Sequence, residues 1–137
     1  MAADPEIVQA LSSTDLFAGV GKKALNAIAA QARVVNHPEG KDITEEGGGA
    51  AGFHLIRSGD VSVTVHGQPR KDLGAADYFG EISMIDGKPR SATVRAKTPV
   101  TTIALASWAF HPILDDHPDV AKQLLRVMCE RLRAAEA

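Results

Sequence analysis

The sequence predicts a mainly β fold with flanking helices: an antiparallel β-roll of jelly-roll type, with N-terminal helices before it and a C-terminal helix after it. Two observations lead to this class. Short strand-like runs separated by turn residues fill the middle of the chain, and helical spacing of apolar residues marks both ends. The clearest strand is Val61–Val65, in which valine alternates with polar residues as in a strand with one buried face.

The chain is expected to form a single domain of residues 1–137, with helices in 1–32, the β-roll in 33–106 and C-terminal helices in 107–137. Its 137 residues suffice for one domain, and 45% of them are hydrophobic, which favours a packed core over disorder. Composition and apolar spacing predict the first two helices at Pro5–Leu11 and Lys22–Ala32.

The predicted strands are bounded by glycine, proline and small polar residues. They are Arg33–Asn36, Lys41–Thr44, Phe53–Arg57, Val61–Val65, Arg90–Ala96 and Val100–Leu105. The polar, glycine-rich segment Glu45–Gly49 is expected to connect the second strand to the third.

After the roll, a short helix is predicted at Trp108–Leu114 and a longer one at Asp119–Ala134, where Pro118 and Asp119 favour a helix start. Apolar residues recur along the longer helix at Val120, Leu124, Met128 and Leu132. This stripe is expected to pack on the roll or on a second chain, and it predicts a homodimer through the C-terminal helix.

Charge and composition exclude several classes of function. The 15 Lys and Arg against 17 Asp and Glu give a net charge of -2, which argues against a surface built for DNA or RNA. The one cysteine, Cys129, forms neither an internal disulfide nor a zinc site with other cysteines. No signal peptide and no apolar run of membrane-spanning length is seen, so we expect a cytoplasmic protein without a membrane partner.

One segment, Tyr78–Val94, carries chemistry. Gly80 permits a close backbone approach, and the short helix predicted at Ile82–Ile85 offers free N–H groups to an anion. Arg90 adds a donor that suits phosphate, whereas the carboxylate of Glu81 suits a hydroxyl donor such as a sugar. The combination predicts a ligand with a phosphate beside a ribose, which describes a nucleotide.

This segment closely resembles the phosphate-binding cassette of the cyclic-nucleotide-binding domain family. Phe79-Gly80-Glu81 and Gly87-Lys88-Pro89-Arg90-Ser91-Ala92-Thr93-Val94 match its pattern at the family's spacing. Upstream, the run Phe53–Gly59 followed by Val61 is similar to the family's strand–glycine–strand signature. The helix–roll–helix order agrees as well, so the resemblance covers nearly the whole chain.

The resemblance implies roles for nine residues. Glu81 would bind the ribose 2′-hydroxyl and Arg90 the cyclic phosphate. The C-terminal helix would close over the base, with Arg131 in a position where bacterial catabolite activators carry an arginine. The remaining residues would complete the phosphate cradle; they are Phe79, Gly80, Ile82, Ser83, Ser91 and Ala92.

The predicted ligand is cAMP, with cGMP as the alternative, and no cofactor or metal is expected. Catabolite activators read adenine with hydroxyl residues one turn beyond Arg131, where this chain has Ala135 and Glu136. The hydroxyl of Ser91 would suit either the phosphate or a guanine amino group. The predicted role is that of a non-catalytic sensor that signals to an unknown effector through its C-terminal helix. In the catabolite activators, a DNA-reading helix-turn-helix follows the C-terminal helix. Residues 1–137 contain no such segment after that helix, so direct binding of DNA by these residues is not expected.

Two other functions remain open at this stage. The first is a ligand-independent interaction or dimerisation module on the same fold. The second is a metal-dependent β-roll enzyme, which would need a cluster of histidines. The five histidines are scattered in the sequence, at His37, His54, His66, His111 and His117.

Overall fold

The computed structural model describes residues 3–45, 47 and 52–136, which form two compact units. One unit combines Met1–Gln31 with Phe110–Ala137, and the other is Ala32–Ala109. The predicted fold class is confirmed, because the second unit holds two antiparallel sheets and the first is helical. The single domain stays a prediction. Of the predicted connection Glu45–Gly49, only Glu45 and Gly47 lie within the described residues.

The helical unit contains α1 (Pro5–Ser12), α2 (Lys22–Gln31), α5 (Pro118–Glu136) and most of α4 (Ser107–Asp116). Asp4 caps α1 by accepting a hydrogen bond from the backbone N–H of Glu6. The unit's core is made of fully buried aliphatic and aromatic side chains, and it includes Leu11, Leu16, Phe17, Ile28, Phe110 and Val120. None of the helices that the structure describes is both long and apolar enough to cross a membrane.

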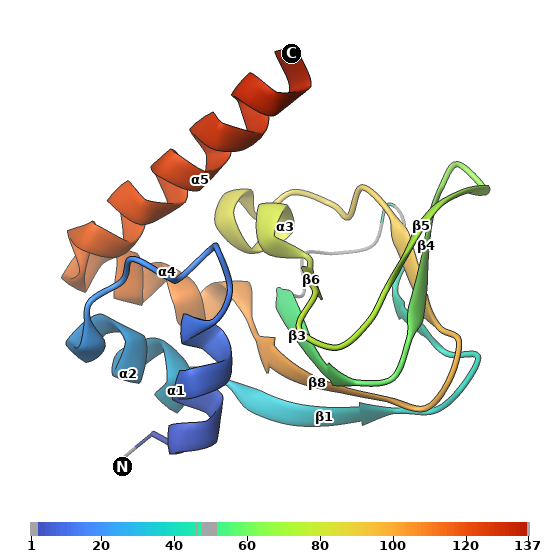
Figure 1. The fold of residues 1–137 in the computed structure, drawn as a ribbon, viewed down its shortest axis with the longest axis horizontal. Helices are drawn as coiled ribbons and strands as arrows, with labels where there is room; N and C mark the ends of the chain where they lie inside the picture. Colours follow the sequence, from blue (N-terminus) through green and yellow to red (C-terminus); the bar gives the residue numbers. More distant parts are fainter. Residues whose placement is uncertain (1–2, 46, 48–51, 137) are drawn as a thin grey trace. The chain divides into compact units, whose positions relative to one another are not determined.

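The strands of the second unit form two four-stranded sheets, ordered β1-β8-β3-β6 and β2-β7-β4-β5 (Figure 1). Their bounds are β1 Arg33–His37, β2 Asp42–Thr44, β3 Phe53–Ser58, β4 Val61–Val65, β5 Gln68–Leu73, β6 Tyr78–Phe79, β7 Thr93–Ala96 and β8 Val100–Leu105. All the strand pairs are antiparallel. Both sheets contribute to one apolar core, which contains Ile56, Val61, Val63, Phe79, Val94, Ala96 and Val100.

Two strands were not predicted from the sequence. β5 is solvent-exposed along nearly its whole length and includes Pro69, so it lacks the apolar alternation of a half-buried strand. β6 has only two residues, too few to show a period. The predicted strand Arg90–Ala96 is shorter in the structure: β7 begins at Thr93, and residues 90–92 are irregular.

The predicted apolar stripe of α5 does not lie on one face of the helix. Val120 and Leu124 are buried, together with Val127, whereas Leu132 is 63% exposed. Residues four apart advance by about 400° around a helix of 3.6 residues per turn, so the stripe drifts by about 40° at each step. The buried face instead contains Val120, Leu124 and Val127, which are spaced by four and then by three residues.

Candidate nucleotide-binding site

The site is built around a turn between β6 and α3 (Glu81–Asp86), which follow each other directly (Figure 1). Gly80 joins them with a φ of 83°, in the left-handed region that favours glycine. A side chain at this position would collide with the carbonyl oxygen of Gly52 and with Nη1 of Arg90. Gly80 therefore meets two requirements at once: the turn itself and the close approach of Arg90.

Arg90 is buried, with only 6% of its surface exposed. Among the described residues, no hydrogen-bond partner reaches its Nη1 or its Nη2. Burial lowers the pKa of Arg90 below its usual value, and the negative charge of Glu81 opposes this effect. Because a buried cation without hydrogen-bonded partners is costly, this guanidinium is suited to an anion from outside the chain.

Glu81 is the first residue of α3 and is partly buried. The first N–H groups of a helix have no partners within it, and Gly80 at the N-cap has no side chain that could satisfy them. These donors, the Glu81 carboxylate and the Arg90 guanidinium therefore belong to one short stretch of surface. An anion and a hydroxyl group, side by side in one ligand, would match it.

A pocket of about 150 Å³ opens at this stretch. It brings together eight of the nine predicted site residues: Phe79, Gly80, Glu81, Ile82, Ser83, Arg90, Ser91 and Ala92. Their exposures differ, because Ser83 is buried while Ile82 is 52% exposed. The ninth residue, Arg131, lies on α5 in the other compact unit, so its contact with a ligand stays a prediction.

Five further residues line the pocket that the sequence did not single out: Thr44, Val63, Lys71, Tyr78 and Val94. Val63 and Lys71 face each other across β4 and β5, so the position of Lys71 depends on a strand that the sequence pattern does not reveal. Tyr78 stands immediately before the Phe-Gly-Glu motif, and this proximity in sequence is the only signal for it.

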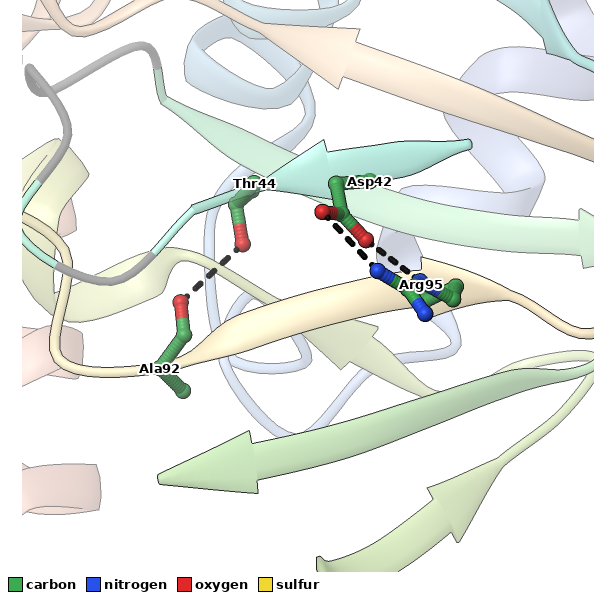
Figure 2. A network of polar contacts seen from close by, with 4 residues as sticks. All are labelled: Asp42, Thr44, Ala92 and Arg95. Atoms are coloured by element: carbon green, nitrogen blue, oxygen red, sulfur yellow. Dashed lines mark hydrogen bonds and ion pairs between the residues drawn. The ribbon is translucent and has the colours of Figure 1, made fainter. Parts of the chain in front are cut away.

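Thr44 connects the edge strand β2 to the segment Arg90–Ala92. Its buried hydroxyl donates a hydrogen bond of 3.3 Å to the carbonyl oxygen of Ala92 (Figure 2). Two residues earlier, the carboxylate of Asp42 accepts hydrogen bonds from Arg95 Nε at 2.7 Å and from Nη2 at 3.3 Å. These contacts hold β2 against β7 at a register irregularity between Asp42 and Thr44.

Gly47, between β2 and β3, also contacts this segment. The backbone N–H of Gly47 donates a hydrogen bond of 2.9 Å to the carbonyl oxygen of Arg90. No group of three His, Cys, Asp or Glu residues able to hold a metal ion occurs in 3–45, 47 and 52–136.

Comparison with known proteins places this fold and site in a family. Residues 34–117 match the family model of the cyclic nucleotide-binding domain, and the chain belongs to that family. It is thus a domain of the cyclic nucleotide-binding, regulatory type. The match includes the whole pocket and both sheets except for the first residue of β1.

Two of the similar relatives are a transcriptional regulator and a kinase regulatory subunit. The chain is 30% identical over 128 residues to a CRP-like cAMP-activated global transcriptional regulator from Mycobacterium tuberculosis, with 90% of this chain and 57% of that protein covered. It is 38% identical over 82 residues to a cAMP-dependent protein kinase regulatory subunit from Emericella nidulans, with 58% of this chain and 20% of that protein covered. The chain therefore spans little more than half of the first relative and a fifth of the second.

Among solved structures, the N-terminal domain of a transcriptional regulator from Streptomyces coelicolor has the same fold. It superposes with a TM-score of 0.78 at 28% identity, with 93% of this chain and 92% of that domain covered. The predicted β-roll with flanking helices is thus a known arrangement for a regulatory domain.

Proposed function

We propose that this domain binds a cyclic mononucleotide, most favourably cAMP, as a non-catalytic sensor. The observation that carries the proposal is the buried guanidinium of Arg90, whose Nη1 and Nη2 lack partners among the described residues. A cyclic phosphate supplies two exocyclic oxygens to such a pair of donors. The cost of burying Arg90 is then offset only when the ligand is bound.

Glu81 is the proposed partner of the ribose 2′-hydroxyl, since a carboxylate accepts hydrogen bonds and repels phosphate. The backbone N–H groups at Ile82 and Ser83 would complete the phosphate cradle on one side, and the segment of Ser91 and Ala92 would complete it on the other. All of these residues line the same pocket.

The names of two relatives include cAMP, which supports adenine as the base. Two cations are proposed to affect this choice. Lys71 lines the pocket from β5, and Arg131 is the residue of α5 that is proposed to contact the ligand. Ser91 follows Arg90 and also lines the pocket. Its hydroxyl would suit a guanine amino group, so cGMP is the second choice of ligand.

The output is proposed to pass through the C-terminal helices. Ser107, the first residue of α4, donates a hydrogen bond of 3.0 Å from its hydroxyl to the carbonyl oxygen of Met84 in α3. A ligand that shifts α3 would therefore also displace the first residue of α4 through this hydrogen bond. Occupancy becomes a signal because the ligand binds one arrangement better than the other.

A homodimer through α5 is the proposed assembly. Leu125 and Leu132 are 65% and 63% exposed and lie seven residues apart, so they share a face with exposed Cys129 between them. Leu124 is buried within its own chain and is unsuited to test the contact. A double variant that carries both Leu125→Glu and Leu132→Glu should sediment as a monomer. The control variant Arg133→Glu should remain a dimer. A monomeric parent protein would contradict this assembly.

The same exposed leucines favour the second candidate, a ligand-independent dimerisation module. The two candidates differ in what Arg90 does, because only a ligand-binding domain uses an unpartnered buried guanidinium. We further propose a cytoplasmic location and no catalysis, since the named relatives are a transcriptional regulator and a kinase regulatory subunit.

Calorimetric titration with cAMP and with cGMP tests the proposal. We expect saturable heat with a dissociation constant in the micromolar range or below for cAMP, weaker binding of cGMP, and unchanged nucleotide at the end. If neither cAMP nor cGMP at millimolar concentration gives heat or a thermal shift, the sensor function is rejected and the ligand-independent dimerisation module is favoured. Hydrolysis of the nucleotide would contradict the non-catalytic role.

A further inference from the structure

A row of polar side chains crosses the sheet that carries the site. The Nε2 of His37 on β1 lies 3.1 Å from the hydroxyl of Thr102 on β8. The Nδ1 of His54 on β3 lies 3.0 Å from the same hydroxyl. His37 and Thr102 are only 5% and 0% exposed, so the row lies in the interior of the unit.

The shared hydroxyl orders the protons of this row. A hydroxyl has one hydrogen and two lone pairs, so the two imidazole nitrogens cannot both accept from Thr102. If both donated, the hydrogen of this buried hydroxyl would lack an acceptor, because the two ring nitrogens are its side-chain partners among the described residues. One nitrogen therefore donates to Thr102 and the other accepts from it. The other ring nitrogen of His37, Nδ1, is buried and has no partner among the described residues. A proton there would be an orphaned buried donor, which is rarer in proteins than an orphaned acceptor. His37 Nε2–H therefore donates to Thr102, and the Thr102 hydroxyl donates to His54 Nδ1.

The row ends on the binding turn. His54 is paired directly with Phe79 across β3 and β6. Their rings are stacked, with centroids 5.1 Å apart and planes 15° from parallel. Phe79 is buried and is followed by Gly80, which touches Arg90. The orientation of the His54 ring is thus transmitted to the residue from which the turn begins.

The charges around the row keep it neutral. Burial, followed by the positive charges of His37, Arg90 and Lys41, lowers the pKa of His54 to about 3. Burial and the charge of Lys41 also lower the pKa of His37. At neutral pH both rings are uncharged, so the alternation of donors and acceptors has one arrangement.

We propose that the hydrogen-bonded row His37–Thr102–His54 positions Phe79, and through it the Gly80–Glu81 turn, so that it sets nucleotide affinity without contact with the nucleotide. None of the three residues lines the pocket. The inference rests on the proposed function for its affinity readout, while the tautomers of the two histidines can be measured without any ligand.

The experiment compares four proteins: the parent, Thr102→Val, Thr102→Ser and the control Thr101→Val. Val keeps the volume of Thr102 and removes the hydroxyl, whereas Ser keeps the hydroxyl and removes a buried methyl. Thr101 lies next to it in β8 and donates a hydrogen bond of 2.8 Å to Asn36 Oδ1, away from the row. The control therefore also loses one side-chain hydrogen bond from the same strand.

We expect Thr102→Val to weaken cAMP binding about tenfold, the scale of one hydrogen bond, and Thr101→Val to change it by less than about twofold. Thr102→Ser should restore the affinity although its melting temperature falls. A merely structural role would instead make affinity follow melting temperature across the series. Nitrogen-15 spectra of the parent at pH 7 should show both histidines with an unprotonated Nδ1.

Parent-level affinity in Thr102→Val would overturn the inference, as would a protonated Nδ1 on either histidine in the parent. If Thr102→Val does not fold, His54→Phe provides the same comparison, because it removes the acceptor of the Thr102 hydroxyl and keeps an aromatic ring beside Phe79. Parent-level affinity in that variant would have the same consequence. Failure of the parent to bind any cyclic nucleotide would count against the proposed function, whereas the nitrogen-15 spectra would still test the row.

Discussion

Two arginines five residues apart, Arg90 and Arg95, differ in burial and in hydrogen-bonded partners, and this difference separates the proposed binding residue from a structural one. The side chain of Arg95 is 59% exposed and is held by the carboxylate of Asp42. This hydrogen bond raises the pKa of Arg95 and lowers that of Asp42. Arg90 is buried, its terminal nitrogens lack partners among the described residues, and burial lowers its pKa.

The difference indicates where each charge is satisfied. Arg95 completes its contacts inside the chain and thereby fixes β2 against β7 (Figure 2). Arg90 is positioned by the fold but not satisfied by it, so its environment is complete only with an anion. A buried charge that destabilises the empty protein is expected at a binding site and is hard to explain by stability alone.

The largest effect is expected at Arg90 itself. Arg90→Ala should weaken cAMP binding by about 2–5 kcal/mol, because it removes one partner of a buried charge pair. Arg95→Ala makes the same change in charge and should leave cAMP binding and stability nearly unchanged, since an exposed ion pair contributes little. Calorimetry measures both variants. Equal losses of cAMP affinity in the two variants would show that Arg90 has no special role in binding.

Gly80→Ala should come next. It forces a φ of 83° on a residue with a side chain and places that side chain against Gly52 and Arg90. We expect the strain and overpacking to cost about 2–4 kcal/mol of stability and to abolish measurable cAMP binding. Gly87→Ala is the control: its φ is 71°, yet no atom lies within 4 Å of the added carbon. Its cost should stay near 1 kcal/mol in thermal unfolding.

Glu81→Ala should cost less than Arg90→Ala, about 1–2 kcal/mol of cAMP binding, because the hydroxyl that it leaves is neutral. The matched ligand is 2′-deoxy-cAMP, which lacks that hydroxyl. The parent should bind the deoxy ligand more weakly than cAMP, and Glu81→Ala should bind the two nearly equally. A full preference for cAMP in the variant would assign Glu81 another role.

A separate effect, on folding stability and not on cAMP binding, is expected from the titration of His54. Its folded pKa of about 3 lies below the usual 6.5, so between these values the unfolded state binds more protons. The contribution to stability is complete above pH 6.5 and is lost as the pH falls below it, by up to about 1.4 kcal/mol per pH unit. Denaturant unfolding of the parent between pH 7 and pH 5 should show this slope, and His54→Phe should reduce it.

The sequence predicted the fold class, and it singled out eight of the pocket residues through the segment from Phe79 to Ala92. That part was accessible because the residues are close in the chain and their types carry distinct chemistry. Thr44 and Lys71 were missed because strand pairing, not sequence proximity, brings them to the pocket. The hydroxyl of Thr44 reaches a carbonyl 48 residues away, and Lys71 lies on a strand without apolar alternation.

The condition of the two arginines was also beyond the sequence. Arg90 and Arg95 occur in the same predicted strand; the motif singled out Arg90, but the sequence does not show that its terminal nitrogens are buried without partners among the described residues. Burial of Arg90 depends on Gly80 and on the arrangement of both sheets. The row of His37, Thr102 and His54 is likewise assembled from three strands, so its histidines appeared scattered along the chain.

The central claim is that the missing partner of Arg90 is the phosphate of a cyclic nucleotide. Nitrogen-15 and phosphorus-31 spectroscopy of the guanidinium groups tests it most directly, with Arg95 as the internal reference. On saturation with cAMP, we expect the Nη signals of Arg90 to shift and to show coupling to the phosphorus across a hydrogen bond, while those of Arg95 stay unchanged. Saturated cAMP binding with unchanged Arg90 signals would contradict the account.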